Sequence, residues 1–174
     1  MIWHTIPFLL QRLFPKRLWH KGKEESKIYL TFDDGPVPGV TDYVLKELAK
    51  RSQKATFFVV GDNIRKNPTL AQELISEGHK LGNHTFNHLN GWKTETSAYL
   101  ENIDLCDKVL EDELGVKTKL FRPPYGLIKS SQASEVSRFH EVVMWNMLSG
   151  DYDERLKPEL VLRKSIQHSK AGSI

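Results

Sequence analysis

Cysteine is nearly absent from this sequence of 174 residues, in which Cys106 is the only one. No disulfide bond can form within the chain, so the fold depends on packing or on a bound metal ion. Long apolar runs are absent as well. The apolar stretch at residues 6–10 ends at Gln11 and Arg12, far short of the ~20 residues that span a bilayer, and no signal-peptide cleavage pattern follows. We therefore expect no transmembrane segment, and a protein that is cytoplasmic or peripheral to a membrane.

A strong charge of one sign is also missing. The 25 basic and 22 acidic residues leave a net charge of +3, with the clearest basic excess at residues 11–23. So mild an excess does not support a nucleic-acid partner. Internal repeats and low-complexity tracts are absent, and nothing in the sequence indicates an oligomeric state.

The length and a hydrophobic content of 39% suit one sizeable core. We divide the chain into an N-terminal segment, residues 1–24, that packs on or precedes the domain, and the domain itself, residues 25–174. The N-terminal segment mixes aromatic, aliphatic and basic residues, a composition that can coat a membrane surface. Packing across the domain's own surface is the commoner fate of such a segment.

Short apolar runs alternate with amphipathic stretches along the rest of the chain. Strands are expected at residues 27–32, 55–60, 80–82, 118–121 and 142–148. Helices are expected at residues 39–51, 68–77, 97–114, 131–139 and 158–168. This alternation predicts an α/β fold with a parallel sheet, either open or closed into a barrel.

Polar residues that suit chemistry follow several of these strands. Asp33 and Asp34 come at the end of the first strand, His84 after the third and Arg122 after the fourth. A (β/α) barrel collects its chemistry on that one rim. A doubly wound sheet is the weaker alternative, because no glycine-rich loop follows the first strand. Residues 171–174 resemble the start of a further strand, so we expect a barrel that is incomplete at the C-terminus.

His84 and His88 are four residues apart, the spacing of one helical turn. With a carboxylate from Asp34 they give three ligands and leave coordination positions open for water and substrate. Zinc commonly takes this set in hydrolases, although two histidines and a carboxylate also describe non-haem iron sites. A turn-capping His84 and an exposed loop His88 are the ordinary alternative, which the two adjacent aspartates on the same rim make less attractive.

Adjacent side chains at a strand end point to opposite faces, so we assign Asp34 as a metal ligand and Asp33 as a base. Arg122 follows a strand at the same rim and could hold Asp33 ionised and oriented. A buried structural ion pair is an equally good reading of Arg122 alone. Tyr125, in a Pro-Pro-Tyr-Gly turn, is a candidate wall of a substrate cleft.

Three motifs, TFDDGP, HTFNH and RPPYG, occur in this order within residues 28–151. Together they closely resemble the polysaccharide deacetylase family, the fourth family of carbohydrate esterases. The resemblance implies a distorted (β/α) barrel and the metal-dependent removal of acetyl groups from N-acetylated sugars of a peptidoglycan- or chitin-like polysaccharide. The partner would be an acetylated glycan, and the cofactor a divalent metal, with Zn²⁺ preferred over Co²⁺ or another ion.

The resemblance also implies roles for individual residues. Asp33 matches the base and Arg122 the residue that positions it, while the metal ligands match Asp34, His84 and His88. Asp151 matches an aspartate that supports the acid, although Tyr152 follows it where the family usually has tryptophan. The residues assigned to the substrate groove are Pro124, Tyr125 and Tyr152, and the backbone N–H in the turn of Tyr125 matches an oxyanion donor.

One element of the family pattern is not matched. A final strand ending in a His-Asp pair supplies the general acid in such enzymes, and His168 does not suit that role because it lies in the preceding predicted helix. Two alternatives therefore stay open. The chain could favour O-acetyl esters, whose alkoxide leaves more readily, or it could be a catalytically impaired carbohydrate-binding relative.

Overall fold

The computed structural model describes residues 4–22 and 26–174. These residues form two compact units. Residues 30–143 make the first, which holds the sheet. Residues 4–22, 26–29 and 144–174 make the second, and each unit is described by itself.

The first unit contains a parallel sheet of five strands in chain order, β1-β2-β3-β4-β5. The strands are β1 (Thr31–Asp33), β2 (Thr56–Val59), β3 (Lys80–Asn83), β4 (Leu120–Phe121) and β5 (Glu141–Val142). A doubly wound sheet reverses its strand order at a switch point, whereas here each crossover adds the next strand on the same side. The α/β fold of the (β/α) barrel type is therefore confirmed.

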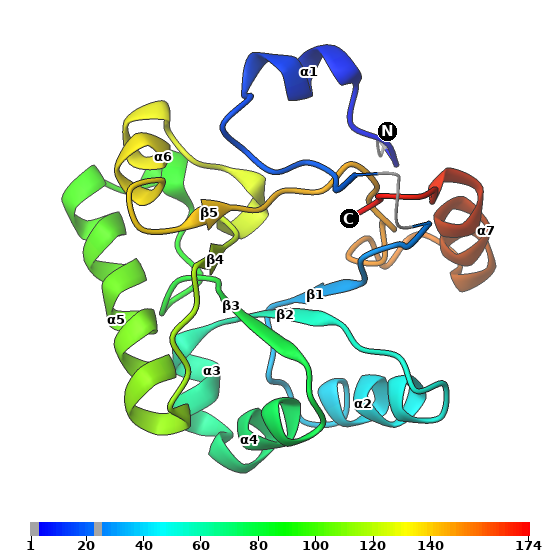
Figure 1. The fold of residues 1–174 in the computed structure, drawn as a ribbon, viewed down its shortest axis with the longest axis horizontal. Coiled ribbons are helices and arrows are strands. Elements are labelled where there is room, and N and C mark those ends of the chain that lie inside the picture. Colours follow the sequence, from blue (N-terminus) through cyan, green and yellow to red (C-terminus); the bar gives the residue numbers. More distant parts are fainter. Residues whose placement is uncertain (1–3, 23–25) are drawn as a thin grey trace. The chain divides into compact units, whose positions relative to one another are not determined.

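Helices cover one side of these strands (Figure 1). They are α2 (Thr41–Ala49), α3 (Gly61–Lys66), α4 (Pro68–Ser76), α5 (Thr96–Leu114) and α6 (Ser130–Val136). The apolar faces of α2, α3, α4 and α5 pack against β2 and β3, whose Phe57, Val59 and Leu81 are at most 5% exposed, whereas α6 lies against α5 and β5. Cys106 of α5 lies in the same core, fully buried, which agrees with its place on the apolar stripe of the predicted helix.

Helix α5 ends where the sequence indicated. Gly115 adopts φ 67° and its N–H donates to the carbonyl of Glu111. A left-handed residue after the last turn is the usual glycine stop of a helix. The short turns η1 (Gly91–Lys93) and η2 (Pro124–Gly126) complete the first unit.

Two predicted strands lose most of their expected length. Residues 27–30 precede β1: the carbonyl of Leu30 still accepts from the N–H of Thr56 in β2, whereas the N–H of Tyr29 donates to the carbonyl of Ser173. Of the run at 142–148, only Val142 belongs to strand β5, where Glu141 precedes it. An unbroken apolar run indicates that the segment is buried, but it does not indicate which strand the segment pairs with.

The second unit holds helices α1 (Phe8–Leu13) and α7 (Pro158–His168). Isolated antiparallel bridges join Thr5 to Met147 and His20 to Ser173. Trp19 is buried, and its indole N–H donates to the carbonyl of Phe14 at 3.2 Å. None of the helices in the part of the chain that the structure describes is long and apolar enough to cross a membrane.

Candidate functional site

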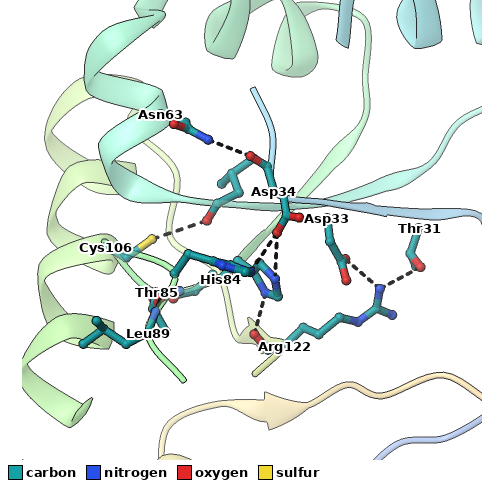
Figure 2. A network of polar contacts seen from close by, with 12 residues as sticks. Thr31, Asp33, Asp34, Asn63, His84, Thr85, Leu89, Cys106 and Arg122 are labelled. Carbon is teal, nitrogen blue, oxygen red and sulfur yellow. Dashed lines mark hydrogen bonds and ion pairs between the residues drawn. The ribbon is translucent and has the colours of Figure 1, made fainter. Parts of the chain in front are cut away.

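The carboxyl ends of neighbouring strands bring the predicted site residues together. Asp33 ends β1, while His84 and Arg122 directly follow β3 and β4. Because β1, β2, β3 and β4 are parallel neighbours, these ends meet at one edge of the sheet (Figure 2). The sequence predicted this convergence from strand ends alone.

Asp34, His84 and His88 converge at this edge. Oδ1 of Asp34 lies 3.3 Å from Nε2 of His84 and 2.9 Å from Nε2 of His88. One potential ligand atom from each residue lies within 4.8 Å of the other two. The imidazoles hold the pKa of the Asp34 carboxyl well below its usual range, so it is ionised at neutral pH.

The tautomer of His84 suits a metal ligand. Its Nδ1 lies 2.7 Å from the carbonyl oxygen of Arg122, and a carbonyl can only accept, so Nδ1 carries the hydrogen. In the neutral ring, Nε2 then presents a lone pair toward the Asp34 carboxylate. Two acceptors at this distance repel unless a proton or a cation lies between them. The donor set, two imidazoles and a carboxylate, therefore fits a divalent cation such as zinc or iron.

The two histidines belong to a loop, and the helical turn suggested by their spacing is absent. Thr85 and His88 adopt positive φ angles of 64° and 55°. Asp34 also has a positive φ, 68°, and its carbonyl accepts a hydrogen bond from Nδ2 of Asn63 at 2.7 Å. Left-handed non-glycine residues are uncommon. Here two of them, Asp34 and His88, carry proposed ligands, and the third, Thr85, directly follows His84.

Side chains that the sequence analysis did not assign brace this loop. Asn83 is fully buried; its Oδ1 accepts from the N–H of Thr85 at 2.8 Å, and its Nδ2 donates to Oδ1 of Asp107 at 2.8 Å. Oδ2 of Asp107 in turn lies 2.9 Å from Nε2 of His140. Asp107 is thus a link between helix α5 and the residue that precedes His84.

A second brace comes from the same helix. Oδ1 of Asn102 accepts from the N–H groups of Phe86 and Asn87, each at 2.9 Å. Asn102 and Asp107 directly flank the buried positions Ile103 and Cys106. Polar residues at the border of an apolar helical stripe are the one sequence signal that could have found them.

Arg122 holds Asp33 on the other side of the site. Nη1 of Arg122 donates to Oδ1 of Asp33 and to Oγ1 of Thr31, both at 2.8 Å (Figure 2). Arg122 is only 2% exposed, whereas the side chain of Asp33 is 30% exposed. Burial lowers the pKa of the Arg122 guanidinium and the Asp33 carboxylate opposes that shift. The pair therefore presents a fixed carboxylate toward solvent.

An aromatic ring supports the guanidinium. The Cζ of Arg122 lies 4.2 Å from the centroid of the Phe58 ring, a cation–π contact. Phe58 in turn requires a glycine at position 82, because a Cβ there would lie 2.5 Å from that ring. Gly82, inside a predicted strand, therefore has a packing role that bears on the site.

The predicted groove residues differ in their surroundings. The Tyr125 side chain is 62% exposed, and its ring centroid lies 4.6 Å from that of His88. Pro124 is buried beneath this turn. Asp151 and Tyr152 belong to the second unit, where both are exposed and Asp151 accepts a hydrogen bond from Oγ of Ser149. The roles of these four residues stay predictions.

A parallel (β/α) fold that gathers ligands for a cation and an arginine-held carboxylate at one edge suits a hydrolytic enzyme. Comparison with known proteins identifies the family. A family model described as polysaccharide deacetylase matches residues 20–144. The chain belongs to the polysaccharide deacetylase family, which confirms the resemblance that the three motifs indicated.

Individual relatives agree with this family. The chain is 33% identical over 154 residues to the peptidoglycan-N-acetylglucosamine deacetylase PgdA of Listeria monocytogenes, an alignment that covers 88% of this chain and 32% of that protein. It is 32% identical over 154 residues to the chitooligosaccharide deacetylase of Azorhizobium caulinodans, covering 87% and 73%. The chain thus spans about a third of the Listeria relative and most of the Azorhizobium one.

A solved structure is similar over nearly the whole chain. The crystal structure of the Bc1960 peptidoglycan N-acetylglucosamine deacetylase matches with a TM-score of 0.88 at 28% sequence identity, covering 97% of this chain and 78% of that one. The backbone of this α/β fold is therefore shared with a deacetylase.

Proposed function

We propose that this chain removes acetyl groups from N-acetylated sugars of a peptidoglycan- or chitin-like polysaccharide by metal-dependent hydrolysis. The observation that carries the proposal is the convergence of Asp34, His84 and His88 beside Asp33, which Arg122 holds. The relatives support the substrate class, because their names specify acetylglucosamine units of peptidoglycan in one case and chitooligosaccharides in the other.

Asp34, His84 and His88 would hold the metal, and Zn²⁺ is the ion we expect first, with Co²⁺ as an alternative. Nδ1 of His84 donates to the carbonyl of Arg122 and so keeps Nε2 free to coordinate. When bound, a divalent ion supplies Lewis-acid chemistry that polarises the acetamide carbonyl and lowers the pKa of water from 15.7 towards ~7.

The chain's own residues supply the proton transfer. Asp33 accepts the proton of the attacking water, and its hydrogen bond from Arg122 fixes the orientation of the carboxylate. The backbone N–H at Tyr125 donates to the developing oxyanion. The exposed ring of Tyr125, beside His88, forms a wall for the sugar. The C–N bond then breaks, and the leaving amine takes up the proton that Asp33 accepted from the water. Asp151 is proposed to support this proton delivery, and Tyr152 to line the groove.

The test is acetate release from N-acetylglucosamine oligomers by the zinc-loaded chain and by Asp33→Asn. We expect Asp33→Asn to lower the rate by about 10²- to 10⁴-fold, the usual contribution of a general base, with bound zinc unchanged. Asp42→Asn, an exposed carboxylate of helix α2, is the matched control and keeps full activity.

Two outcomes would contradict the proposal. Loss of zinc in Asp33→Asn would reverse the roles of the two adjacent aspartates. A zinc-loaded wild-type chain that binds acetylated glycans without releasing acetate would make it a binding module.

A further inference from the structure

We propose that helix α1 and the turn after it dock this protein on a membrane surface that contains anionic lipid. The docking surface consists of five exposed residues, Phe8, Leu9, Arg12, Leu13 and Lys16. Phe8, Leu9 and Leu13 are 72%, 71% and 65% exposed, and α1 contains no buried residue. Clustered large apolar side chains left in water mark an interaction surface.

The helix that carries these side chains is anchored at both ends within its own unit. Before α1, the N–H of Ile6 donates to the carbonyl of Asn146 at 3.0 Å, next to the bridge from Thr5 to Met147. After α1, Trp19 is buried and its indole N–H donates to the carbonyl of Phe14. The exposed apolar face therefore belongs to a fixed segment, and leaving it in water is a property of the folded unit.

The charge along this segment of the chain has one sign. Residues 1–23 contain five lysine and arginine residues and no aspartate or glutamate, whereas the whole chain has 22 acidic residues. Of the cations, Arg12 and Lys16 are exposed, while Arg17 is half-buried and stacks on the ring of Phe14 at 4.1 Å. Exposed cations flanking apolar side chains are the composition of a segment that lies in the interface of an anionic bilayer.

Other occupants fit this surface less well. A second copy docked through the same face would bring Arg12 and Lys16 against like charges. A soluble polyanion would use the cations and leave Phe8, Leu9 and Leu13 in water. An anionic lipid surface suits both parts of this surface, because its headgroups pair with the cations and its acyl chains surround the apolar side chains.

The experiment is co-sedimentation of the full chain with vesicles of phosphatidylcholine alone or with one quarter phosphatidylglycerol, at about 0.1 M salt. We expect binding to the anionic vesicles only. Arg12→Gln with Lys16→Gln should weaken it about 30-fold, since each cation near such a surface contributes about a fivefold factor. Phe8→Ser with Leu9→Ser and Leu13→Ser should abolish binding, and acetate release should be unchanged.

Helix α7 supplies the matched control. Its Leu162 and Ile166 are 61% and 69% exposed and neighbour both Glu159 and Arg163, so the charge beside them is mixed. Leu162→Ser with Ile166→Ser should bind the anionic vesicles as the wild type does. The assay uses neither substrate nor metal, so its result is independent of the deacetylase activity.

Three results would overturn the proposal. The first is wild-type binding to neither vesicle. The second is undiminished binding by the Phe8, Leu9 and Leu13 variant while its thermal unfolding matches the wild type. The third is a wild-type dimer that the same variant converts to monomer, which would assign the surface to a second copy.

Discussion

A buried histidine stands at each end of strand β3, and the two differ in which ring nitrogen holds the hydrogen. Nδ1 of His84, after the strand, faces a backbone carbonyl at 2.7 Å and must donate. Nδ1 of His79, before the strand, accepts from the N–H of Ala55 at 3.2 Å, so the hydrogen of the neutral ring is on Nε2. His84 therefore turns a lone pair toward Asp34, whereas His79 has none left to offer.

The surroundings sharpen this difference. His79 packs edge-on against Phe57 with ring centroids 5.2 Å apart, and its Nε2 has no hydrogen-bond partner among the residues that the structure describes. The nearest acidic oxygen, on Glu77, is 3.9 Å away. Burial alone thus does not make a histidine a ligand. The backbone group that its other nitrogen meets decides between coordination and structure.

The largest expected effect is that of His84→Ala. Removing one of three proposed ligands should release the metal and lower acetate release by about 10³-fold or more, since a catalytic metal supplies several kcal/mol. Metal analysis and the acetate assay measure both, with the exposed His20→Ala as control. A His84→Ala protein that retains stoichiometric zinc would show that His84 is not a ligand, and the contrast with His79 would not hold.

A smaller effect is expected from the brace behind His84. Asp107→Ala removes one of the two acceptors of Asn83, the other being the carbonyl of Ile103, and should weaken zinc binding by about 10- to 100-fold, as losses of groups that orient ligands do. Asp107→Asn keeps an acceptor oxygen for Asn83 and should retain most of the affinity. Asp104→Ala, exposed on the same helix, is the control. Equal zinc affinity in Asp107→Ala and wild type would show that the loop needs no brace from α5.

At the other end of strand β3, a substitution of His79 should change the free energy of unfolding and nothing else. His79→Leu leaves the N–H of Ala55 buried without its acceptor, which costs about 1–3 kcal/mol of the free energy of unfolding. Urea denaturation measures this cost, and zinc affinity and activity should be those of the wild type. Loss of zinc with retained stability would mean that the two histidines had been assigned the wrong way round.

The smallest expected effect concerns pH. Burial, followed by the charge of Lys54, lowers the pKa of His79 below its ordinary value of 6.5, and Glu77 opposes the shift. Below that value the unfolded chain binds a proton that the native ring refuses, so the contribution of His79 to stability is full above pH 6.5 and declines as the pH falls. Stability measured against pH should fall less steeply in His79→Leu. An unchanged slope would assign the acid sensitivity to other groups.

The sequence predicted the parts of this molecule that depend on a local pattern. Alternating strands and helices indicated the parallel sheet, and polar residues at strand ends identified Asp33, Asp34, His84 and Arg122. Helix α3 escaped prediction because six residues with Ile64 as the only large apolar side chain show no periodicity. The residues that brace the loop of His84 could not be predicted for another reason. Asn83 and Asp107 are far apart in the sequence and come into contact only after the chain has folded.

The backbone conformations at the candidate site could not be predicted from the sequence either. Six non-glycine residues of the described chain have positive φ, and four of them, Asp34, Thr85, His88 and Tyr125, are at the candidate site. Nothing in a string of residue types marks a left-handed backbone where glycine is absent. The spacing of His84 and His88 even suggested a helical turn, which the loop replaces.

Those four angles have a consequence for engineering. Each left-handed non-glycine residue costs on the order of 1–3 kcal/mol, so glycine at an exposed position such as Tyr125 would relieve the backbone while removing a side chain from the rim. A search for heat-resistant variants that ignores turnover should therefore accumulate glycines at this edge. At such positions, selection for stability and selection for activity favour different residues.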